Sequence, residues 1–365
     1  MKAVILVGGE ATRLHPLTYN IPKAMVPVLN TPFLEHVVHY LSKHQIKDII
    51  LAQSHLHSLQ SYFGDGSHIG VKLSYVVEDA PLGTAGAVKN AEKYLHETFL
   101  VLNGDIFTDL DITAMIVSHL ERKPKATIAL TPVDDPTSYG LIETNAQGRV
   151  TRFLEKPKWS QVTTNMINAG TYLLEPDVLN YIPPQANFSF ERGLFPLLLE
   201  QGKPIYACPS SAYWIDMGTP EKYLQLHKDL LTGKGSQYGF TSGDEVLIGD
   251  QSYIHPTAQI KGPTLIGNNC TIGQKVKLKG PVVIGSGCTI LEDAVIEESI
   301  IWRNVRLEQH VSLKNSIVAD NCHLNASSLI EDSVLGSNVT VASGCKLEPG
   351  SRISPGTIVE PKTDS

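Results

Sequence analysis

Residues 1–28 read MKAVILVGGEATRLHPLTYNIPKAMVPV. The apolar run Val4–Val7 has the length of a buried strand, and Gly8 and Gly9 follow it directly. Glycines at this point let backbone N–H groups close on an anion, because no Cβ blocks the approach. The spacing fits neither GxGxxG nor GxxxxGK[ST], since Lys23 comes fourteen residues after Gly9. The stretch therefore predicts a phosphate-binding turn of another kind, after the first strand of an α/β sheet.

Up to about residue 232 the chain alternates short β-rich runs with longer amphipathic stretches, which predicts an α/β domain with a mostly parallel, mixed sheet. We expect strands at residues 3–7, 48–52, 72–77, 99–102, 126–130 and 167–173, and helices at 33–44, 113–122 and 220–231. The stretch TGKGSQYGFTSGD at 232–244 is rich in Gly and Ser, as linkers are. The predicted organisation is a catalytic domain at 1–232, a linker at 233–245 and a second domain at 246–361.

The second domain has a six-residue period. Aliphatic side chains recur at Ile254, Ile260, Ile266, Ile272, Leu278, Ile284, Ile290 and Ile296, and again at Leu329, Leu335, Val341, Leu347, Ile353 and Val359. Between the two runs the register slips. This periodicity predicts a parallel β-helix and resembles the left-handed β-helix of the hexapeptide-repeat family, in which three hexapeptides make one coil. Cys270 and Cys288, eighteen residues apart, should then face inward on adjacent coils.

Composition narrows the class of protein. The chain has 365 residues with 30 basic and 37 acidic side chains, a net charge of −7, and no Lys/Arg stripe, which argues against a nucleic-acid binder. The N-terminal apolar run is too short for a membrane span or a signal peptide, so we expect a cytoplasmic protein without a membrane partner. The five cysteines include no CxxC pair, so reduced thiols are expected.

From Gly8 to Val28 the sequence resembles the opening motif of the sugar-1-phosphate nucleotidyltransferases, roughly GGxGTRLxPLTxxxPKxxxPV. Ala11 departs from it, because it stands where that family usually has its third glycine. Six further motifs follow in the family's order: Pro81-Leu82-Gly83-Thr84-Ala85, Asn103-Gly104-Asp105, Tyr139-Gly140, Glu155-Lys156-Pro157, Asn168-Ala169-Gly170 and Trp214-Ile215-Asp216-Met217-Gly218. The resemblance implies a Rossmann-like nucleotidyltransferase domain.

The implied reaction joins a sugar 1-phosphate to the α-phosphorus of a nucleoside triphosphate and releases pyrophosphate. A sugar phosphate is already mostly a dianion at neutral pH, so the reaction needs cations and in-line positioning rather than a general base. The resemblance assigns the catalytic cations to Arg13, Lys23 and Lys156. It assigns a Mg²⁺ ion to Asp105 and Asp216, carboxylates at the ends of apolar runs, which are costly to bury unless they are paired or bind a metal.

The resemblance also assigns the substrate contacts. The nucleotide would contact Gly8, Gly9, Glu78, Gly83, Thr84 and Gly104, and the sugar would contact Gly140, Glu155, Asn168 and Gly170. Glu78 should face the base. The ionised carboxylate of a glutamate can only accept hydrogen bonds. Guanine offers it two neighbouring donors, N1–H and the 2-amino group, so GTP is the favoured nucleotide. The segments APLGTAG and SFERGLFP resemble mannose-1-phosphate guanylyltransferases, so mannose 1-phosphate is the favoured sugar and GDP-mannose the favoured product.

Other interpretations of the sequence stay open. The enzyme could instead be a glucose-1-phosphate thymidylyl- or uridylyltransferase, because nothing in the sequence places a group at C2 of the sugar. Hexapeptide β-helices also occur in acyltransferases that use a histidine base, for which His255, His310 and His323 are candidates. A non-catalytic regulatory homologue is the third alternative, since Ala11 replaces a glycine. Because an open β-helix end exposes strand edges, we expect homo-oligomers formed through the β-helix.

Overall fold

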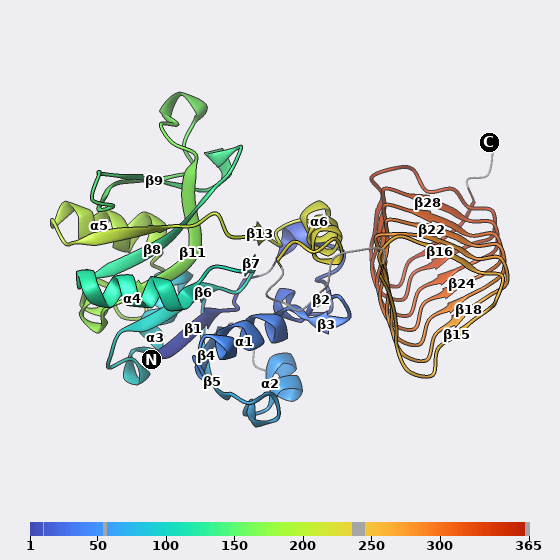
Figure 1. Ribbon diagram of the computed structural model, residues 1–365, viewed down its shortest axis with the longest axis horizontal. Coiled ribbons are helices and arrows are strands. Elements are labelled where there is room, and N and C mark those ends of the chain that lie inside the picture. The colour runs from blue at the N-terminus through green and yellow to red at the C-terminus, as the bar shows by residue number, and fades with distance from the viewer. Residues whose placement is uncertain (10, 54–56, 236–244, 362–365) are drawn as a thin grey trace. The chain divides into compact units, whose positions relative to one another are not determined.

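The computed structural model describes residues 1–9, 11–53, 57–235 and 245–361 (Figure 1). The chain divides into two compact units, which are described separately below. The first unit combines Met1–Gly9 with Val37–Asp216, and the second combines Glu10–His36 with Met217–Ser365. Most of the predicted linker, 236–244, lies outside the described residues. No helix within the described ranges is long and apolar enough to cross a membrane.

A nine-stranded mixed sheet is the centre of the first unit (Figure 1). Four strands run parallel in the order β6 (Phe99–Asn103), β1 (Lys2–Leu6), β4 (Asp48–Gln53) and β5 (Lys72–Val77). The other five are β8 (Ala126–Pro132), β9 (Gly140–Thr144), β10 (Val150–Glu155), β11 (Met166–Leu174) and β12 (Ile205–Pro209). They join the parallel strands through β11, which is antiparallel to β6. The predicted α/β class is confirmed.

The α-helices of the described residues are α1 (Phe33–Lys43), α2 (His57–Phe63), α3 (Gly83–Asn90), α4 (Ile112–Arg122), α5 (Phe195–Glu200) and α6 (Pro220–Leu231). Three of these six helices, α1, α4 and α6, start and end close to the predicted limits, and α2, α3 and α5 were not predicted. α4 begins one residue earlier than expected, because the side chain of Asp111 caps it by accepting a hydrogen bond from the backbone N–H of Ala114. A short antiparallel pair, β7 (Ile106–Thr108) and β13 (Trp214–Asp216), lies beyond the end of β6.

The second unit contains the predicted parallel β-helix, in which three sheets of short strands are stacked coil on coil (Figure 1). The first sheet is β14 (Val246–Ile248), β17 (Thr264–Ile266), β20 (Val282–Ile284), β23 (Ile300–Ile301), β26 (Ile317–Val318), β29 (Val334–Leu335) and β31 (Arg352–Ile353). The second is β15 (Tyr253–Ile254), β18 (Thr271–Ile272), β21 (Thr289–Ile290), β24 (Arg306–Leu307), β27 (His323–Leu324), β30 (Thr340–Val341) and β32 (Ile358–Val359). The third is β16 (Gln259–Lys261), β19 (Lys277–Lys279), β22 (Val295–Glu297), β25 (Ser312–Lys314) and β28 (Leu329–Glu331). The periodic aliphatic residues from Ile266 to Ile296 form the core together with inward Cys270 and Cys288, and so do Leu335, Val341 and Leu347 of the second run. The prediction is wrong for Leu329, which is exposed, because the shortened coil turns its neighbour Ile330 inward instead.

The slip in the hexapeptide register has a structural cause. Thr264 pairs with Val282, eighteen residues on, whereas Ile300 pairs with Ile317, seventeen residues on. The shorter coils lose one residue at the corner between the third sheet and the first, where a buried serine stands in each coil: Ser299, Ser316 and Ser333. These serines form a ladder, because the hydroxyl of each of the first two accepts a hydrogen bond from the backbone N–H of the next.

The segment after the glycine loop belongs to this second unit and packs with α6 and the β-helix. It includes the hairpin of β2 (Pro27–Val28) and β3 (Thr31–Pro32). The backbone N–H of Leu29 donates to Nε2 of buried His227, 3.1 Å away, and burial lowers the pKa of His227 to about 4. The side chain of Asn30 donates to the carbonyl of Ile284 on the β-helix, at 2.9 Å. The hairpin is therefore held by α6 and by the β-helix.

Candidate active site

The carboxyl ends of β1, β5 and β6 lie at one edge of the first unit's sheet, and predicted nucleotide-binding residues follow each of them. Gly8 and Gly9 follow β1, Glu78 follows β5, and Gly104 follows β6. Gly104 donates its backbone N–H to the carbonyl of Leu6, and a Cβ at Gly104 would lie 2.4 Å from that oxygen. Only glycine fits there. In parallel sheets this edge is where ligands bind.

Glu78 and the start of α3 are tied together by hydrogen bonds. Oε2 of half-buried Glu78 accepts from the backbone N–H of Leu82 at 3.0 Å, which holds the carboxylate against the segment that leads into α3. Gly83 has a φ of 69°, and an added Cβ would lie 2.8 Å from the carbonyl of Phe188. The hydroxyl of Thr84 donates to Oε2 of Glu191 and accepts from a backbone N–H, so it is engaged inside the protein.

Two aspartate residues lie close to each other in the pair β7–β13. Asp216 lies directly opposite Ile106, the residue after Asp105, so the two carboxylate residues occupy neighbouring positions. Asp216 is 7% exposed, and the hydroxyl of Tyr139 donates to its Oδ2 at 2.5 Å. No group of three or more metal-ligating side chains occurs among the described residues. Two carboxylates suit Mg²⁺, which takes one or two from a protein and completes its shell with water and substrate phosphates.

The predicted sugar contacts lie on β9, β10 and β11. Gly140 pairs with Glu155, and a Cβ at Gly140 would lie 3.0 Å from Oε2 of Glu155. Burial raises the pKa of the Glu155 carboxyl, and the charge of Glu191 raises it further, while Lys156 and Arg192 act against the shift. Lys156 is exposed, has a φ of 48°, and donates its backbone N–H to the carbonyl of Tyr139.

Asn168 and Gly170 lie at an irregularity of β11, where its pairing with β8 shifts register. The backbone N–H of Gly170 donates to Oδ1 of Asn168 at 2.9 Å, and the side chain of Asn168 donates to the hydroxyl of Tyr172 at 2.7 Å. Gly170 has a φ of 72°, and an added Cβ would lie 2.7 Å from the side-chain nitrogen of Asn103. The Tyr172 ring is fully buried, which raises the pKa of its hydroxyl. The structure thus brings the candidate sugar residues to the same part of the sheet.

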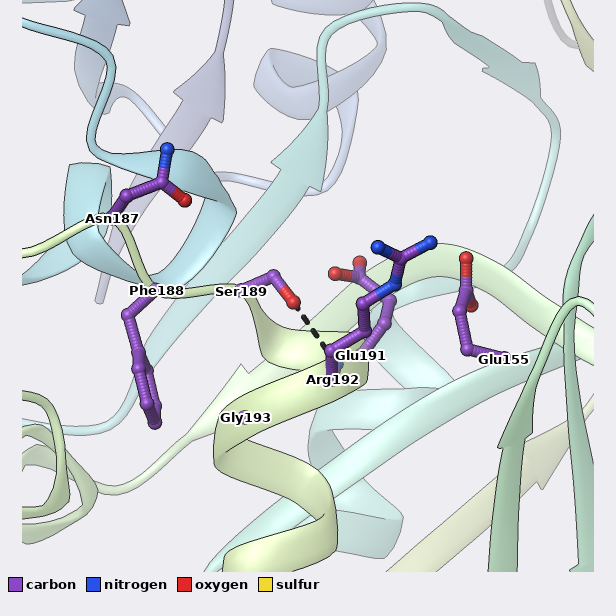
Figure 2. Close-up of a pocket in the computed structure, with 7 residues that line it drawn as sticks. All are labelled: Glu155, Asn187, Phe188, Ser189, Glu191, Arg192 and Gly193. Carbon is purple, nitrogen blue, oxygen red and sulfur yellow. Dashed lines mark hydrogen bonds between the residues drawn. The ribbon is translucent and has the colours of Figure 1, made fainter.

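A cavity of about 410 Å³ opens beside Glu155 (Figure 2). Its lining residues are Glu155, Asn187, Phe188, Ser189, Glu191, Arg192 and Gly193. Only Glu155 was among the predicted site residues. The segment SFERGLFP resembles the family, but no residue in it was predicted to contact a substrate. It forms a π-helix at Phe190–Leu194, which no periodic sequence pattern predicts.

Arg13 and Lys23 belong to the second unit. Arg13 lies in the short helix Thr12–Leu14, and Lys23 begins another at Lys23–Met25. Ala11, in the position of the expected third glycine, has φ 48° and ψ 36°. This left-handed conformation explains why glycine is usual there, and it costs an alanine about 1 kcal/mol. The side chain of Arg352, on the last β-helix coils, donates to the backbone carbonyl of Arg13 at 3.3 Å.

The histidines considered for acyl transfer lie on separate coils of the β-helix. Nδ1 of His255 is 2.9 Å from the hydroxyl of Thr257, and Nε2 of His323 is 3.1 Å from a carboxylate oxygen of Glu308. His310 occupies a coil corner with a φ of 59°. The three histidines therefore lie apart on different coils and do not form one site.

Comparison with known proteins finds family matches in two successive parts of the chain. The family described as nucleotidyl transferase matches residues 2–233. Two hexapeptide families match the remainder: bacterial transferase hexapeptide (six repeats) at 245–280, and the LbH domain of EIF2B subunit epsilon at 274–364. These matches agree with the left-handed β-helix expected from the periodicity.

Similar proteins cover most of the chain. A mannose-1-phosphate guanylyltransferase of Mycobacterium tuberculosis is 37% identical over 72% of this chain and 74% of its own length. A UTP–glucose-1-phosphate uridylyltransferase of Synechocystis is 34% identical over 87% of both chains. The crystal structure of HddC from Yersinia pseudotuberculosis complexed with GMP-PN has a TM-score of 0.52 and 34% identity, covering 62% of this chain and 97% of HddC. The chain therefore belongs to the nucleotidyl transferase family, as a sugar-1-phosphate nucleotidyltransferase with a C-terminal hexapeptide-repeat β-helix.

Proposed function

We propose that the protein transfers the guanylyl group of GTP to mannose 1-phosphate and releases GDP-mannose and pyrophosphate. The observation that carries the choice of base is Glu78, a half-buried carboxylate at the ligand-binding edge of the sheet, held by the N–H of Leu82. The similarity to a mannose-1-phosphate guanylyltransferase and to a protein crystallised with GMP-PN supports the same choice.

The base preference follows from counting donors and acceptors. A carboxylate has about four acceptor positions and no donor, so the bond from Leu82 leaves Glu78 able to accept from a ligand. Guanine presents an N1–H beside a 2-amino group. Uracil and thymine present one N–H between two carbonyls, whose lone pairs would face the carboxylate. Each such mismatch costs about 1–3 kcal/mol, which favours GTP by roughly 5- to 150-fold.

The proposed chemistry uses fixed charges to let two anions meet. Arg13 would bind the departing pyrophosphate, Lys23 would lie by the attacked α-phosphate, and Lys156 would bind the sugar phosphate. Asp105 and Asp216 would hold a Mg²⁺ ion, which supplies charge neutralisation and orients the phosphates when bound. Enzymes of this family generally use a divalent metal. The sugar phosphate attacks in line at the α-phosphorus without a general base.

We further propose which residues line the two substrate sites. Gly8, Gly9, Gly83, Thr84 and Gly104 would line the nucleotide site; Gly140, Glu155, Asn168 and Gly170 would line the sugar site. The domain limits would be 1–232 for catalysis and 246–361 for the β-helix, through which copies of the chain would associate.

All five cysteines are unpaired thiols, which supports a cytoplasmic location.

A single assay tests the proposed reaction. Pyrophosphate release is measured with GTP, ATP, UTP and dTTP, each with mannose 1-phosphate and glucose 1-phosphate. GTP with mannose 1-phosphate should give the highest kcat/KM. The second candidate, uridylyl transfer to glucose 1-phosphate, is favoured by the Synechocystis relative. A higher kcat/KM for UTP or dTTP with glucose 1-phosphate would replace the guanylyl assignment.

A further inference from the structure

The cavity beside Glu155 contains an acidic side chain to which the reaction assigns no role. Figure 2 shows the side chains of Glu155, Glu191 and Arg192 extending into the same region of this cavity, while Phe188 points elsewhere. The volume of about 410 Å³ lies within the range of small-ligand sites and accommodates a hexose ring. Glu155, at the end of β10, was predicted by resemblance to contact the sugar. Glu191 lies on another segment, the π-helix Phe190–Leu194, and was not predicted to contact a substrate.

The backbone of this segment has an unusual conformation that aims Glu191 at the cavity. Residues Phe190–Leu194 form a π-helix, capped by the hydroxyl of Ser189, which accepts from the backbone N–H of Arg192 at 2.9 Å. Phe190 and Leu194 are fully buried, so they fix the turn from the core side. A Cβ at Gly193 would lie 2.6 Å from the Phe188 ring, so a larger residue here would displace that ring. Such π-turns are rare and occur frequently at functional sites.

Two hydroxyl groups hold the carboxylate of Glu191. Its Oε2 accepts from the hydroxyl of Thr84 at 3.0 Å, and its Oε1 accepts from the hydroxyl of Tyr172 at 3.3 Å. Tyr172 in turn accepts from the side chain of Asn168 at 2.7 Å. Thr84, the second residue of α3, lies in the predicted nucleotide segment, and Asn168 is a predicted sugar contact. Glu191 therefore joins the two substrate-binding motifs through one carboxylate.

We propose that Glu191 is a specificity-determining residue of the sugar site, whose carboxylate accepts a hydrogen bond from one hydroxyl of the hexose 1-phosphate. This rests on the proposed function and deepens it. One bond from a protein hydroxyl to each oxygen leaves acceptor positions on both. The bonds from Thr84 and Tyr172 fix the direction of those positions, and Glu155 lines the same cavity with a second acceptor.

The test compares Glu191→Gln with a matched control, Glu200→Gln, which makes the same change at an exposed position of α5. For Glu191→Gln the KM for the hexose 1-phosphate should rise about 10- to 100-fold, the loss expected for a hydrogen bond to a charged group, while the KM for the nucleoside triphosphate changes less than about threefold. Glu200→Gln should behave as the unaltered protein.

A panel of monodeoxy hexose 1-phosphates separates contact from structural support. The unaltered protein should discriminate against one deoxy sugar, and Glu191→Gln should lose that discrimination while keeping it at the other positions. An equal penalty for every sugar and for the nucleotide would overturn the proposal. If Glu191→Gln does not fold, Tyr172→Phe removes one of the hydroxyls that orient the carboxylate and should weaken the same discrimination; unchanged discrimination there would also overturn it. Absence of any turnover by the unaltered protein would instead refute the proposed function.

Discussion

Replacing Tyr139 by phenylalanine tests whether the pair Asp105 and Asp216 is a working part of the site. The Tyr139 hydroxyl donates to Oδ2 of Asp216 at 2.5 Å, and Asp216 is 7% exposed, so little water is available to replace the lost donor. The Tyr139 ring packs edge-on against Trp214, with ring centroids 5.5 Å apart, and this contact is kept in Tyr139→Phe. The substitution therefore removes the hydrogen bond to Asp216 and keeps the packing of the ring.

The expected loss follows from the charge on the acceptor. A hydrogen bond to a charged group contributes about 1.5–3 kcal/mol, which corresponds to a loss of roughly 10- to 150-fold in kcat/KM. Because the bond orients a proposed metal ligand, the Mg²⁺ concentration needed for half-maximal pyrophosphate release should also rise.

The matched control is Tyr75→Phe, which removes a hydroxyl bonded to the carbonyl of Gly64 at 2.7 Å, away from the aspartates. It should leave both the rate and the Mg²⁺ requirement unchanged. Activity of Tyr139→Phe within about twofold of the unaltered protein, with the same Mg²⁺ dependence, would refute the assignment of Asp216 to the metal.

Further outcomes are expected for three variants and for the unaltered protein. Arg13→Ala should lower kcat by roughly 10²–10³-fold, as the loss of one preorganised charge-stabilising donor does, and a loss below about tenfold in pyrophosphate release would contradict its role. Glu155→Gln should lower kcat/KM for the sugar at least tenfold. Burial raises the pKa of Glu155, so ionisation of this side chain lowers the stability of the folded protein, but only above the ordinary pKa of a glutamate. Glu155→Gln should therefore melt at a higher temperature than the unaltered protein at pH 8, and the difference should shrink toward pH 4. A difference in melting temperature that does not change with pH would show that ionisation is not the cause. Ser316→Ala should lower the free energy of unfolding by about 1–3 kcal/mol in urea denaturation, because it leaves the N–H of Ser333 without its buried acceptor. Ser312→Ala is the control. An equal effect of the two substitutions would show that the serine ladder does not stabilise the β-helix. Light scattering at micromolar concentration should give a mass above that of one chain, and a monomer would count against association through the β-helix.

The amino-acid sequence alone was sufficient to predict both kinds of architecture. The six-residue period identifies the β-helix because each inward position must be aliphatic when identical coils stack, and the run from Ile254 to Ile296 follows this rule. The glycines after Val4–Val7 predict the turn at the end of β1 for a local reason, the absence of a Cβ. Local rules of this kind also explain why the ends of α4 and α6 were predicted within one residue.

Tertiary structure decided what depends on contacts between distant residues. The slip in the β-helix register becomes intelligible only when the coils are stacked, since the shorter corners are stabilised by Ser299 and Ser316 bonding to the next coil. Asp105 and Asp216 are neighbours because β13 pairs with β7 across more than a hundred residues of chain. Glu191 was missed for the same reason: its partners Thr84 and Tyr172 are remote in sequence, and the π-helix that aims it at the cavity follows no periodic pattern. A sequence displays local preference and repetition directly, whereas hydrogen bonds between remote side chains exist only after the chain has packed.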